Sequence, residues 1–479
     1  MRTDIMGQKM LIAGEWEERE QTIEVRDPGD NSLIDTVPAA SASDMKKAIE
    51  SAKQEMKENT VLPVHQRIEI LNRAAENVNE QKEIFATIIA REGSKTIEEA
   101  RDEVDRTIQI LRISAEEARR IQGKTISFDQ VPGSENRVGY YTHFPVGVVG
   151  AITAFNDPLN LVAHKVGPAL ASGNAVIVKP TTVTPLSALH LAEALIDAGL
   201  PPALLSVVTG KGSELGDPLI KHPDVRMISF TGGLETGEKI TEKSGVKKLR
   251  MELGSNSPVI VLNDADIENA VKKTVSGAFS AAGQNCIGVQ RVFIEKDIAD
   301  AFTEQFLKET SKLNMGRKLS ETTDMGPMIS EEEAKRIEQW VNEAVKEGAE
   351  ILCGGERQGA YYTPTVLTNV PPHCKIACEE AFAPIVSLFS VENLQEAIEK
   401  ANAVNYGLQA GIFTPNIDKA YEAIEKLEYG GVIVNDSSDY RIDAMPFGGV
   451  KGSGIGREGV KFAIESMTEK KVVCFNVSK

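Results

Sequence analysis

The sequence predicts an α/β fold with a parallel sheet covered by helices on both faces, a second α/β region and a small β arm. Residues 145–262 alternate helical segments with short, almost continuously apolar runs, which are typical of the buried strands of such a sheet. The length of 479 residues also exceeds what one hydrophobic core normally supports. We therefore expect about two or three domains.

Residues 42–122 have the spacing of amphipathic helices. Apolar side chains recur at intervals of three and four residues, for example at Ile68, Leu71, Ala75 and Val78. The charged positions between them are typical of solvated helix faces. We expect these helices to form a scaffold beside the sheet.

A β-hairpin is predicted between residues 124 and 143. Two short alternating segments, 125–128 and 137–141, flank the turn residues Pro132 and Gly133. The hairpin is expected either to project as an arm or to form an ordinary edge hairpin. A last apolar strand, at residues 470–477, is expected to pair with this hairpin or with another subunit.

Four strands of the parallel sheet are expected at residues 147–152, 175–178, 205–208 and 226–230, with helices from Pro158 and after Pro185. Such sheets bind ligands beyond the carboxyl ends of their strands. The second α/β region is expected to begin with a strand at residues 258–262 and to continue through helices near residues 297–313 and 330–348. It contains Cys286.

Composition excludes several classes of protein. The net charge of −17 opposes a surface that binds polyanions, so we expect no nucleic-acid partner. No run approaches 18 apolar residues, and residues 1–12 lack the apolar core of a signal peptide, so we expect no membrane partner and a cytoplasmic location. Five cysteines form no disulfide framework and suit a reducing compartment.

Cys286 is the strongest candidate for a catalytic residue. It lies in a run of small residues at 279–288, where Gly283 and Gly288 allow close backbone approach or turns that bulkier residues resist. A thiolate in such surroundings is a strong nucleophile. The alternative is a buried cysteine that only packs.

Polar residues follow several expected strands. Asn156 is expected at the sheet edge, where its amide could donate to an oxyanion or cap the next helix. Lys179 ends a strand and could bind ribose hydroxyls or remain an ordinary surface lysine. Gly232 and Gly233 precede a helix whose amides attract phosphate, although they depart from the usual G-x-G-x-x-G pattern. Glu252, beside Gly254 and apolar neighbours, suits a general base with a raised pKa, or else a cap or ion pair.

The pair Cys374 and Cys378 has the spacing of half a metal site. No second pair of cysteines or histidines with ligand spacing accompanies it, so the sequence predicts no metal.

Four segments, 251–254, 283–286, 379–384 and 446–454, resemble motifs of the NAD(P)-dependent aldehyde dehydrogenase superfamily in order and spacing. The resemblance covers nearly the whole chain. It implies a Rossmann-like cofactor domain at residues 1–122 and 145–251 and an α/β catalytic domain at residues 252–455. Residues 123–144 and 456–479 would form the oligomerisation arm and tail of a homodimer or homotetramer.

The resemblance also implies a mechanism. The thiolate of Cys286 would attack an aldehyde, the Asn156 amide and the Cys286 N–H would hold the oxyanion, and hydride would pass to NAD or NADP. Glu252 would then remove a proton from the water that hydrolyses the thioester. Cofactor contacts are implied for a further set of residues: Lys179, Thr182, Thr231, Gly232, Gly233, Glu380, Phe382, Thr153 and Phe155. Ala383 replaces a glycine common in the family, a change expected to be tolerated.

The cofactor preference and the substrate are less constrained. Thr182 stands where many relatives that prefer NAD have a glutamate, so no carboxylate there repels the 2′-phosphate of NADP. Arg441 resembles a residue of the subgroup that acts on lactaldehyde, phosphonoacetaldehyde or glyceraldehyde 3-phosphate, and its guanidinium suits a carboxylate or phosphate. Asp157, Arg112 and His164 are further pocket candidates. Arg441 could equally be a structural partner of the aspartates at positions 439 and 443.

The expected function is oxidation of a short aliphatic aldehyde, hydroxylated or anionic, to its acid. One alternative is a CoA-acylating dehydrogenase, against which the carboxylate of Glu252 argues. Another is a cysteine hydrolase, which would pair Cys286 with one of the six histidines. A third is a relative that keeps the fold without the chemistry.

Overall fold

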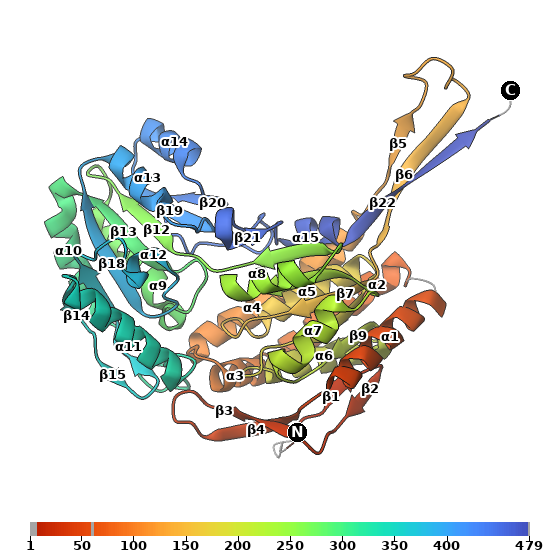
Figure 1. Cartoon of the computed structure of the whole chain (residues 1–479), viewed down its shortest axis with the longest axis horizontal. Coiled ribbons are helices and arrows are strands. Elements are labelled where there is room, and N and C mark those ends of the chain that lie inside the picture. The colour runs from red at the N-terminus through yellow and green to blue at the C-terminus, as the bar shows by residue number, and fades with distance from the viewer. Residues whose placement is uncertain (1–6, 59–61, 478–479) are drawn as a thin grey trace.

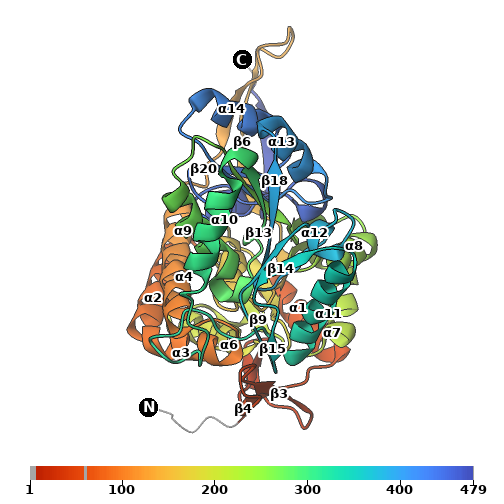
Figure 2. The same cartoon turned by 90° about the vertical axis from the view of Figure 1, so that its left-hand side faces the viewer.

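The computed structural model describes residues 7–58 and 62–477. Two large sheets with their helices form two lobes, and a three-stranded arm projects from the body (Figure 1). The lobe of the second sheet is at the left of Figure 1, and the first sheet with its helices fills the centre and lower right. A hairpin of β3 (Thr22–Arg26) and β4 (Leu33–Pro38) lies at the end opposite the arm (Figures 1 and 2).

The first sheet has eight strands, in the order β2 (Glu15–Glu17), β1 (Met10–Ile12), β9 (Leu205–Val207), β8 (Ala175–Lys179), β7 (Val148–Ile152), β10 (Val225–Thr231), β11 (Lys248–Glu252) and β21 (Gly454–Ile455). Strands β9, β8, β7, β10 and β11 are parallel, whereas β1 and β21 pair antiparallel at either side. The four strands predicted between residues 147 and 230 are confirmed.

Helices cover both faces of the first sheet, as the sequence predicts. They are α1 (Ala42–Glu58), α2 (Val64–Glu80), α3 (Lys82–Glu92), α4 (Ile97–Ala118), α5 (Asn160–Ala171), α6 (Leu186–Asp197), η1 (Pro202–Leu204), α7 (Gly212–Lys221) and α8 (Leu234–Lys243). Val176 and Val178 of β8 pack with α2 to α6, and Ile177 between them packs with α1 and α7 on the opposite face. This alternation of side chains along one strand holds the two helical layers together.

The second sheet has seven strands, in the order β14 (Glu350–Cys353), β17 (Thr365–Thr368), β18 (Ile385–Val391), β13 (Val289–Glu295), β12 (Ser257–Val261), β19 (Gln409–Phe413) and β20 (Gly431–Val434). Only β14 pairs antiparallel in this sheet. Its helices are α9 (Ile267–Phe279), η2 (Ser280–Gly283), α10 (Lys296–Thr310), α11 (Glu331–Lys346), α12 (Lys375–Cys378), α13 (Leu394–Asn402) and α14 (Ile417–Lys426). A small hairpin joins β15 (Arg357–Gln358) to β16 (Tyr361–Tyr362).

The arm consists of β5 (Lys124–Ser127), β6 (Arg137–Pro145) and β22 (Thr468–Asn476). Strand β22 pairs antiparallel with the whole of β6, which confirms that the last strand joins the hairpin. The three strands form a sheet of their own that extends away from the body, so the hairpin is an arm (Figure 1). Between the second sheet and β22, the chain forms η3 (Lys451–Ser453) and α15 (Val460–Ser466). Helix α15 packs against the hydrophobic core between the first sheet and helices α2 to α6.

Within the described residues, none of the helices combines the length and the apolar character needed to cross a lipid bilayer.

Candidate active site

A cavity of about 660 Å³ lies beyond the carboxyl ends of β7, β10 and β11. Residues that follow these strands line the cavity together with Arg106 of α4, the loop that carries Cys286 and several segments of the second lobe. The lining includes most of the residues singled out in the sequence, namely Thr153, Phe155, Asn156, Asp157, Thr231, Gly232, Gly233, Glu252, Cys286, Glu380, Phe382 and Arg441. The structure therefore brings the predicted thiol, amide and acid to one cavity.

The loop before Cys286 has an unusual backbone. Ala281, Ala282 and Gly283 all have positive φ angles, of 51°, 54° and 68°. A Cβ atom on Gly283 would lie 2.0 Å from the carbonyl oxygen of Ala383, so glycine is required there by contact as well as by conformation. Two consecutive left-handed alanines are costly and persist only where surrounding contacts hold them.

The side chain of Glu99 supplies one of those contacts. Its Oε1 accepts a hydrogen bond of 2.7 Å from the backbone N–H of Ala281. Its Oε2 accepts a bond of 2.8 Å from the N–H of Thr96, in the capping box that begins α4. Glu99 thus ties the cysteine loop of one lobe to a helix of the other.

Cys286 is partly exposed to the cavity. Burial of the sulfur raises the pKa of Cys286 to about 12; Arg441 acts against this shift, whereas the carboxylates of Asp157, Glu380 and Glu252 add to it. The residue is consequently a neutral thiol at neutral pH, and its proton must leave when the sulfur attacks.

Glu252 ends β11 and is buried. Neither of its carboxylate oxygens has a hydrogen-bond partner within the part of the chain that the structure describes. Burial, together with the negative charge of Glu458, raises the pKa of Glu252 well above its usual value. A buried carboxylate beside a cavity, with a raised pKa, is suited to accept a proton from water.

Next to Glu252 lies a cluster of buried charges that the sequence analysis did not identify. Glu458 Oε1 lies 3.3 Å from Lys165 Nζ and 3.5 Å from Arg250 Nη2, and all three side chains are fully buried. Burial opposes the ionisation of Glu458, but Lys165, His164 and Arg250 outweigh it and lower the pKa of Glu458. Lys165 is a charged position within the largely apolar helix α5, and Arg250 lies between two apolar residues of β11, a pattern that could have pointed to this cluster.

The cofactor side of the cavity contains two aromatic rings and an acid. The rings of Phe155 and Phe382 meet edge to face, with centroids 5.6 Å apart. Oε1 of Glu380 accepts a hydrogen bond of 2.8 Å from the N–H of Ser255. A Cβ atom on Gly254 would lie 2.4 Å from Oε2 of Glu380, so glycine at this position makes room for the acid.

The predicted nucleotide residues divide into two groups. Gly232 and Gly233 line the cavity, and Gly233 caps the N-terminus of α8. Lys179 and Thr182 lie outside this lining. Lys179 Nζ is buried and donates to the carbonyl of Pro180 at 2.9 Å, and burial lowers the pKa of Lys179 to about 8. Thr182 donates to the carbonyl of Gly210.

Arg441 combines the two roles that the sequence left open. It lines the cavity, with its guanidinium carbon 3.7 Å from the ring centroid of Phe447. It also has structural partners, because Nη2 lies 3.4 Å from Glu458 Oε2 and Nε lies 3.7 Å from Asp443 Oδ1. Of the two aspartates considered as partners, Asp443 is the one beside Arg441, whereas Asp439 accepts a hydrogen bond from the Ser437 hydroxyl.

A second arginine of the cavity was missed in the sequence. Arg106 lines the cavity and binds Asp443 through two hydrogen bonds, from Nη2 at 2.9 Å and from Nε at 3.2 Å. The predicted Arg112 lies six residues further along α4, on its exposed face and outside the cavity lining. Six residues along a helix of 3.6 residues per turn leave a side chain about 120° away from its starting direction, so Arg112 points away from the cavity that Arg106 lines.

Of the remaining candidates, Asn156 and Asp157 line the cavity, whereas His164 lies outside its lining. Asn156 follows β7 and lines the cavity with its side chain partly exposed. The carboxylate of Asp157 forms ion pairs with Lys95 and, at 3.9 Å, with Arg106. His164 is buried, with Nε2 3.0 Å from Asp443. Asp157 therefore lies between two cations, Lys95 and Arg106, of which Arg106 lines the cavity.

Comparison with known proteins agrees with this geometry. A family model described as "Aldehyde dehydrogenase family" matches residues 16–473. The chain belongs to the aldehyde dehydrogenase family. The predicted family, fold class and reaction class, oxidation of an aldehyde, are thereby confirmed.

Other members of the family align along almost the whole chain. Aspartate-semialdehyde dehydrogenase 1 of Pseudomonas canavaninivorans is 50% identical, over 96% of this chain and 97% of its own. The 3-sulfolactaldehyde dehydrogenase of Priestia aryabhattai is 46% identical, over 99% of both chains.

Two solved aldehyde dehydrogenase structures superpose closely. Aldehyde dehydrogenase 21 of Physcomitrella patens, in complex with the product succinate, has a TM-score of 0.96 and 37% identity over 99% of both chains. NADP-dependent glyceraldehyde-3-phosphate dehydrogenase of Bacillus halodurans, complexed with NADP, has a TM-score of 0.96 and 38% identity, over 99% of this chain and all of that one.

Proposed function

We propose that this aldehyde dehydrogenase oxidises short anionic aldehydes to their acids with NAD or NADP, through a thioester on Cys286. The observation that carries the proposal is that Cys286, Glu252 and the guanidinium of Arg441 line one cavity, and that the Glu252 carboxylate has no hydrogen-bond partner within residues 7–58 and 62–477. The names of similar proteins also refer to small acidic compounds. Two are named for aspartate semialdehyde and 3-sulfolactaldehyde, and a third is in complex with succinate, and each of these compounds carries a carboxylate or sulfonate.

The cavity fits a nicotinamide dinucleotide. Helix α8 begins directly after Gly232 and Gly233, and its N-terminus lies at the cavity. The backbone N–H groups of such a terminus suit a pyrophosphate. Glu380 is positioned to bind ribose hydroxyls, and the Phe155–Phe382 pair offers apolar support to a ring. When bound, the dinucleotide supplies the hydride acceptor. Thr153, Thr231, Lys179 and Thr182 complete the proposed contacts. The first sheet and its helices, expected at residues 1–122 and 145–251, would form the cofactor domain, and residues 252–455 would supply the thiol.

The proposed chemistry has two stages. The Cys286 sulfur attacks the carbonyl carbon as its proton leaves to cavity water, while the Asn156 amide and the Cys286 N–H stabilise the oxyanion. Loss of hydride leaves a thioester on Cys286. Glu252 then removes a proton from water, which adds to the thioester and releases the acid and the thiol.

We propose that Arg441 anchors the carboxylate or sulfonate of the substrate and that Arg106 adds to the positive potential of the cavity. Arg441 presents its Nη1 side without a hydrogen-bond partner in residues 7–58 and 62–477, and Phe447 holds its plane. A guanidinium fixed in this way binds a carboxylate or sulfonate without further ordering.

The two alternatives fit less well. A CoA-acylating enzyme does not need a base for water, yet Glu252 lines the cavity and its carboxylate has no hydrogen-bond partner among the described residues. A cysteine hydrolase needs an imidazole beside the thiol, and no histidine stands among the described residues that line this cavity.

Succinic semialdehyde and butanal form a matched test pair, because they share four carbons and differ by one carboxylate. We expect a kcat/KM for succinic semialdehyde about 10- to 100-fold higher than for butanal, the worth of one charge-assisted hydrogen-bonded contact. Equal values for the two aldehydes would contradict the anionic substrate class, whereas absence of reduced cofactor with both would contradict the dehydrogenase chemistry.

We further propose that the arm pairs subunits into a homodimer or homotetramer. Val138, Tyr140, Phe144, Val472 and Phe475 are exposed apolar side chains on its strands. We also propose a cytoplasmic location, because all five cysteines are free thiols. Light scattering of the purified protein measures its mass in solution, and a monomeric mass would contradict the proposed homodimer or homotetramer.

A further inference from the structure

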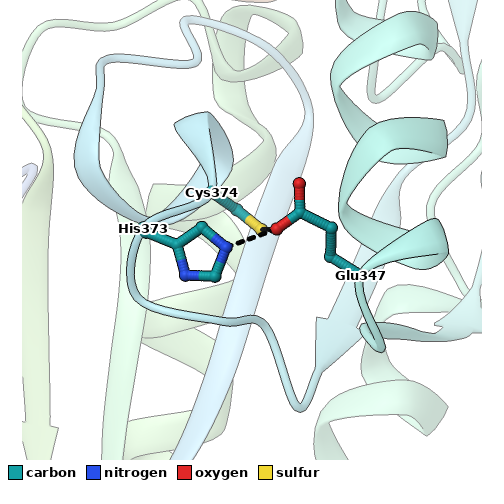
Figure 3. Close-up of side chains that lie close together, drawn as sticks. All are labelled: Glu347, His373 and Cys374. Atoms are coloured by element: carbon teal, nitrogen blue, oxygen red, sulfur yellow. Dashed lines mark hydrogen bonds and ion pairs between the residues drawn. The ribbon is translucent and has the colours of Figure 1, made fainter.

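Three side chains of metal-ligating type meet outside the lining of the active-site cavity (Figure 3). Glu347 directly follows α11, and His373 and Cys374 lie in the turn before α12. Their ligand atoms all lie within 4.8 Å of one another. None of the three lines the catalytic cavity as the described residues define it. This cluster therefore needs an explanation of its own.

The spacing of the ligand atoms suits a tetrahedral ion. Cys374 Sγ lies 3.7 Å from Glu347 Oε2, and His373 Nε2 contacts the same oxygen. An ion held at ordinary zinc–sulfur and zinc–oxygen bond lengths separates those two ligand atoms by about 3.6 Å. Sulfur and oxygen thus already stand at the separation that zinc requires, and the exposed imidazole needs only a side-chain rotation.

The ligand types also indicate which ion would bind. A thiolate, an imidazole and a carboxylate form a set of borderline softness, which favours zinc and similar divalent ions over magnesium or calcium. Cys374 is buried, whereas Glu347 and His373 are exposed, so an ion could enter from solvent and keep water as a fourth ligand.

The protein scaffold holds the cysteine in place. Asn256 donates to the carbonyl of Ala377 at 3.1 Å, and Gln290 donates to the carbonyl of Ile376 at 3.1 Å. These two bonds hold the backbone of α12, which follows Cys374 directly. Cys378 is one turn away, and its thiol donates to the carbonyl of His373 rather than joining the cluster. The competing explanation is a hydrogen-bonded contact that closes the end of α11 on the turn before α12.

We propose that Glu347, His373 and Cys374 form a surface site for one divalent ion of the zinc class. The geometry on which this rests is the convergence of three ligand types from two separate segments, α11 and the turn before α12. The ion would join these segments and stabilise the folded chain, since binding to the folded state alone adds to its stability.

The test measures zinc bound to the full-length Cys286→Ser protein by equilibrium dialysis, because the catalytic thiol could itself bind zinc. We expect one equivalent of zinc, retained when Cys378→Ser is added as the matched control. Adding Cys374→Ser or His373→Ala should abolish or strongly weaken binding. Zinc should also raise the Tm of the Cys286→Ser protein and leave the Tm of Cys286→Ser/Cys374→Ser unchanged.

Equal zinc stoichiometry in the proteins with and without Cys374→Ser would overturn the proposal. So would the absence of bound zinc in Cys286→Ser, which would leave the hydrogen-bonded contact as the explanation. A variant that fails to fold is recognised by its far-UV circular dichroism without zinc, and Glu347→Gln then replaces it as the test of the same site.

Discussion

The carboxylate of Glu99 accepts a hydrogen bond of 2.7 Å from the backbone N–H of Ala281, which lies five residues before Cys286. Ala281 and Ala282 are held in the left-handed conformation, and Gly283 follows them with its Cα against the Ala383 carbonyl. A helix cap in one lobe therefore fixes the loop that presents the thiol in the other. Positioning of the nucleophile depends on a residue outside the cavity.

Glu99→Gln should lower kcat about 10-fold or more with little change in KM, because a small misplacement of the thiol affects reaction more than binding. The amide can accept on only one atom, so either Ala281 or Thr96 loses its acceptor. The rate of alkylation of Cys286 by iodoacetamide should change as well. Glu98→Gln, on the exposed side of the same helical turn, is the control; identical kinetics in the two variants would show that Glu99 does not position the thiol.

Arg441→Ala should reduce kcat/KM for succinic semialdehyde by about 10- to 100-fold, through loss of a charge-assisted contact. The value for butanal should change much less. Arg441→Lys should restore only part of the loss, because an ammonium lacks the planar pair of N–H donors with which a guanidinium binds a carboxylate. Arg112→Ala, on the exposed face of α4, serves as the control. Equal losses for both aldehydes would show that Arg441 acts only through Glu458 and Asp443.

Alkylation of Cys286 in the protein without cofactor should become faster with pH. Burial raises the pKa of Cys286 to about 12, so the reactive thiolate is a small fraction at neutral pH and increases about tenfold for each pH unit. The iodoacetamide rate measured from pH 7 to pH 9 should therefore rise without levelling. A plateau below pH 8 would mean that the thiol is already ionised in the resting protein.

Thr182→Glu should weaken NADP selectively. A carboxylate three positions after Lys179 would repel the 2′-phosphate, and we expect KM for NADP to rise about tenfold or more while KM for NAD changes little. Thr182→Gln has nearly the same size without the charge and separates repulsion from shape. Parallel changes for both cofactors in Thr182→Glu would place the 2′-phosphate elsewhere.

Local pattern was enough to predict much of the fold. The strands near residues 147, 175, 205 and 226 are short apolar runs, and the helices of residues 42–118 have clear periodicity. The N-terminal strands β1 and β2 were missed, because Met10–Ile12 is only three residues long and acquires its place by pairing with β9, almost two hundred residues away. Such pairing has no local signature.

The candidate site shows the same division. Cys286, Asn156 and Glu252 follow strands or small-residue runs and could be placed from sequence. Arg106 could not, since its role depends on Asp443, which is distant in the chain. Lys165 and Glu458 are likewise paired only by tertiary structure. The sequence suggested Cys374 and Cys378 as half a metal site and offered no second ligand pair, whereas the structure places Cys374 with His373 and Glu347, and Glu347 follows the distant helix α11.

The most direct test of the proposed chemistry is a rapid-mixing experiment on Glu252→Gln with aldehyde and the preferred dinucleotide. The carboxylate of Glu252 raises the pKa of Cys286, so its loss should not hinder formation of the thiolate. We predict a burst of one equivalent of reduced cofactor, an acyl adduct on Cys286 in the intact mass, and steady turnover about 10²-fold slower or more. Steady turnover equal to that of the unmodified protein, or a burst without an adduct on Cys286, would contradict hydrolysis of a thioester by Glu252.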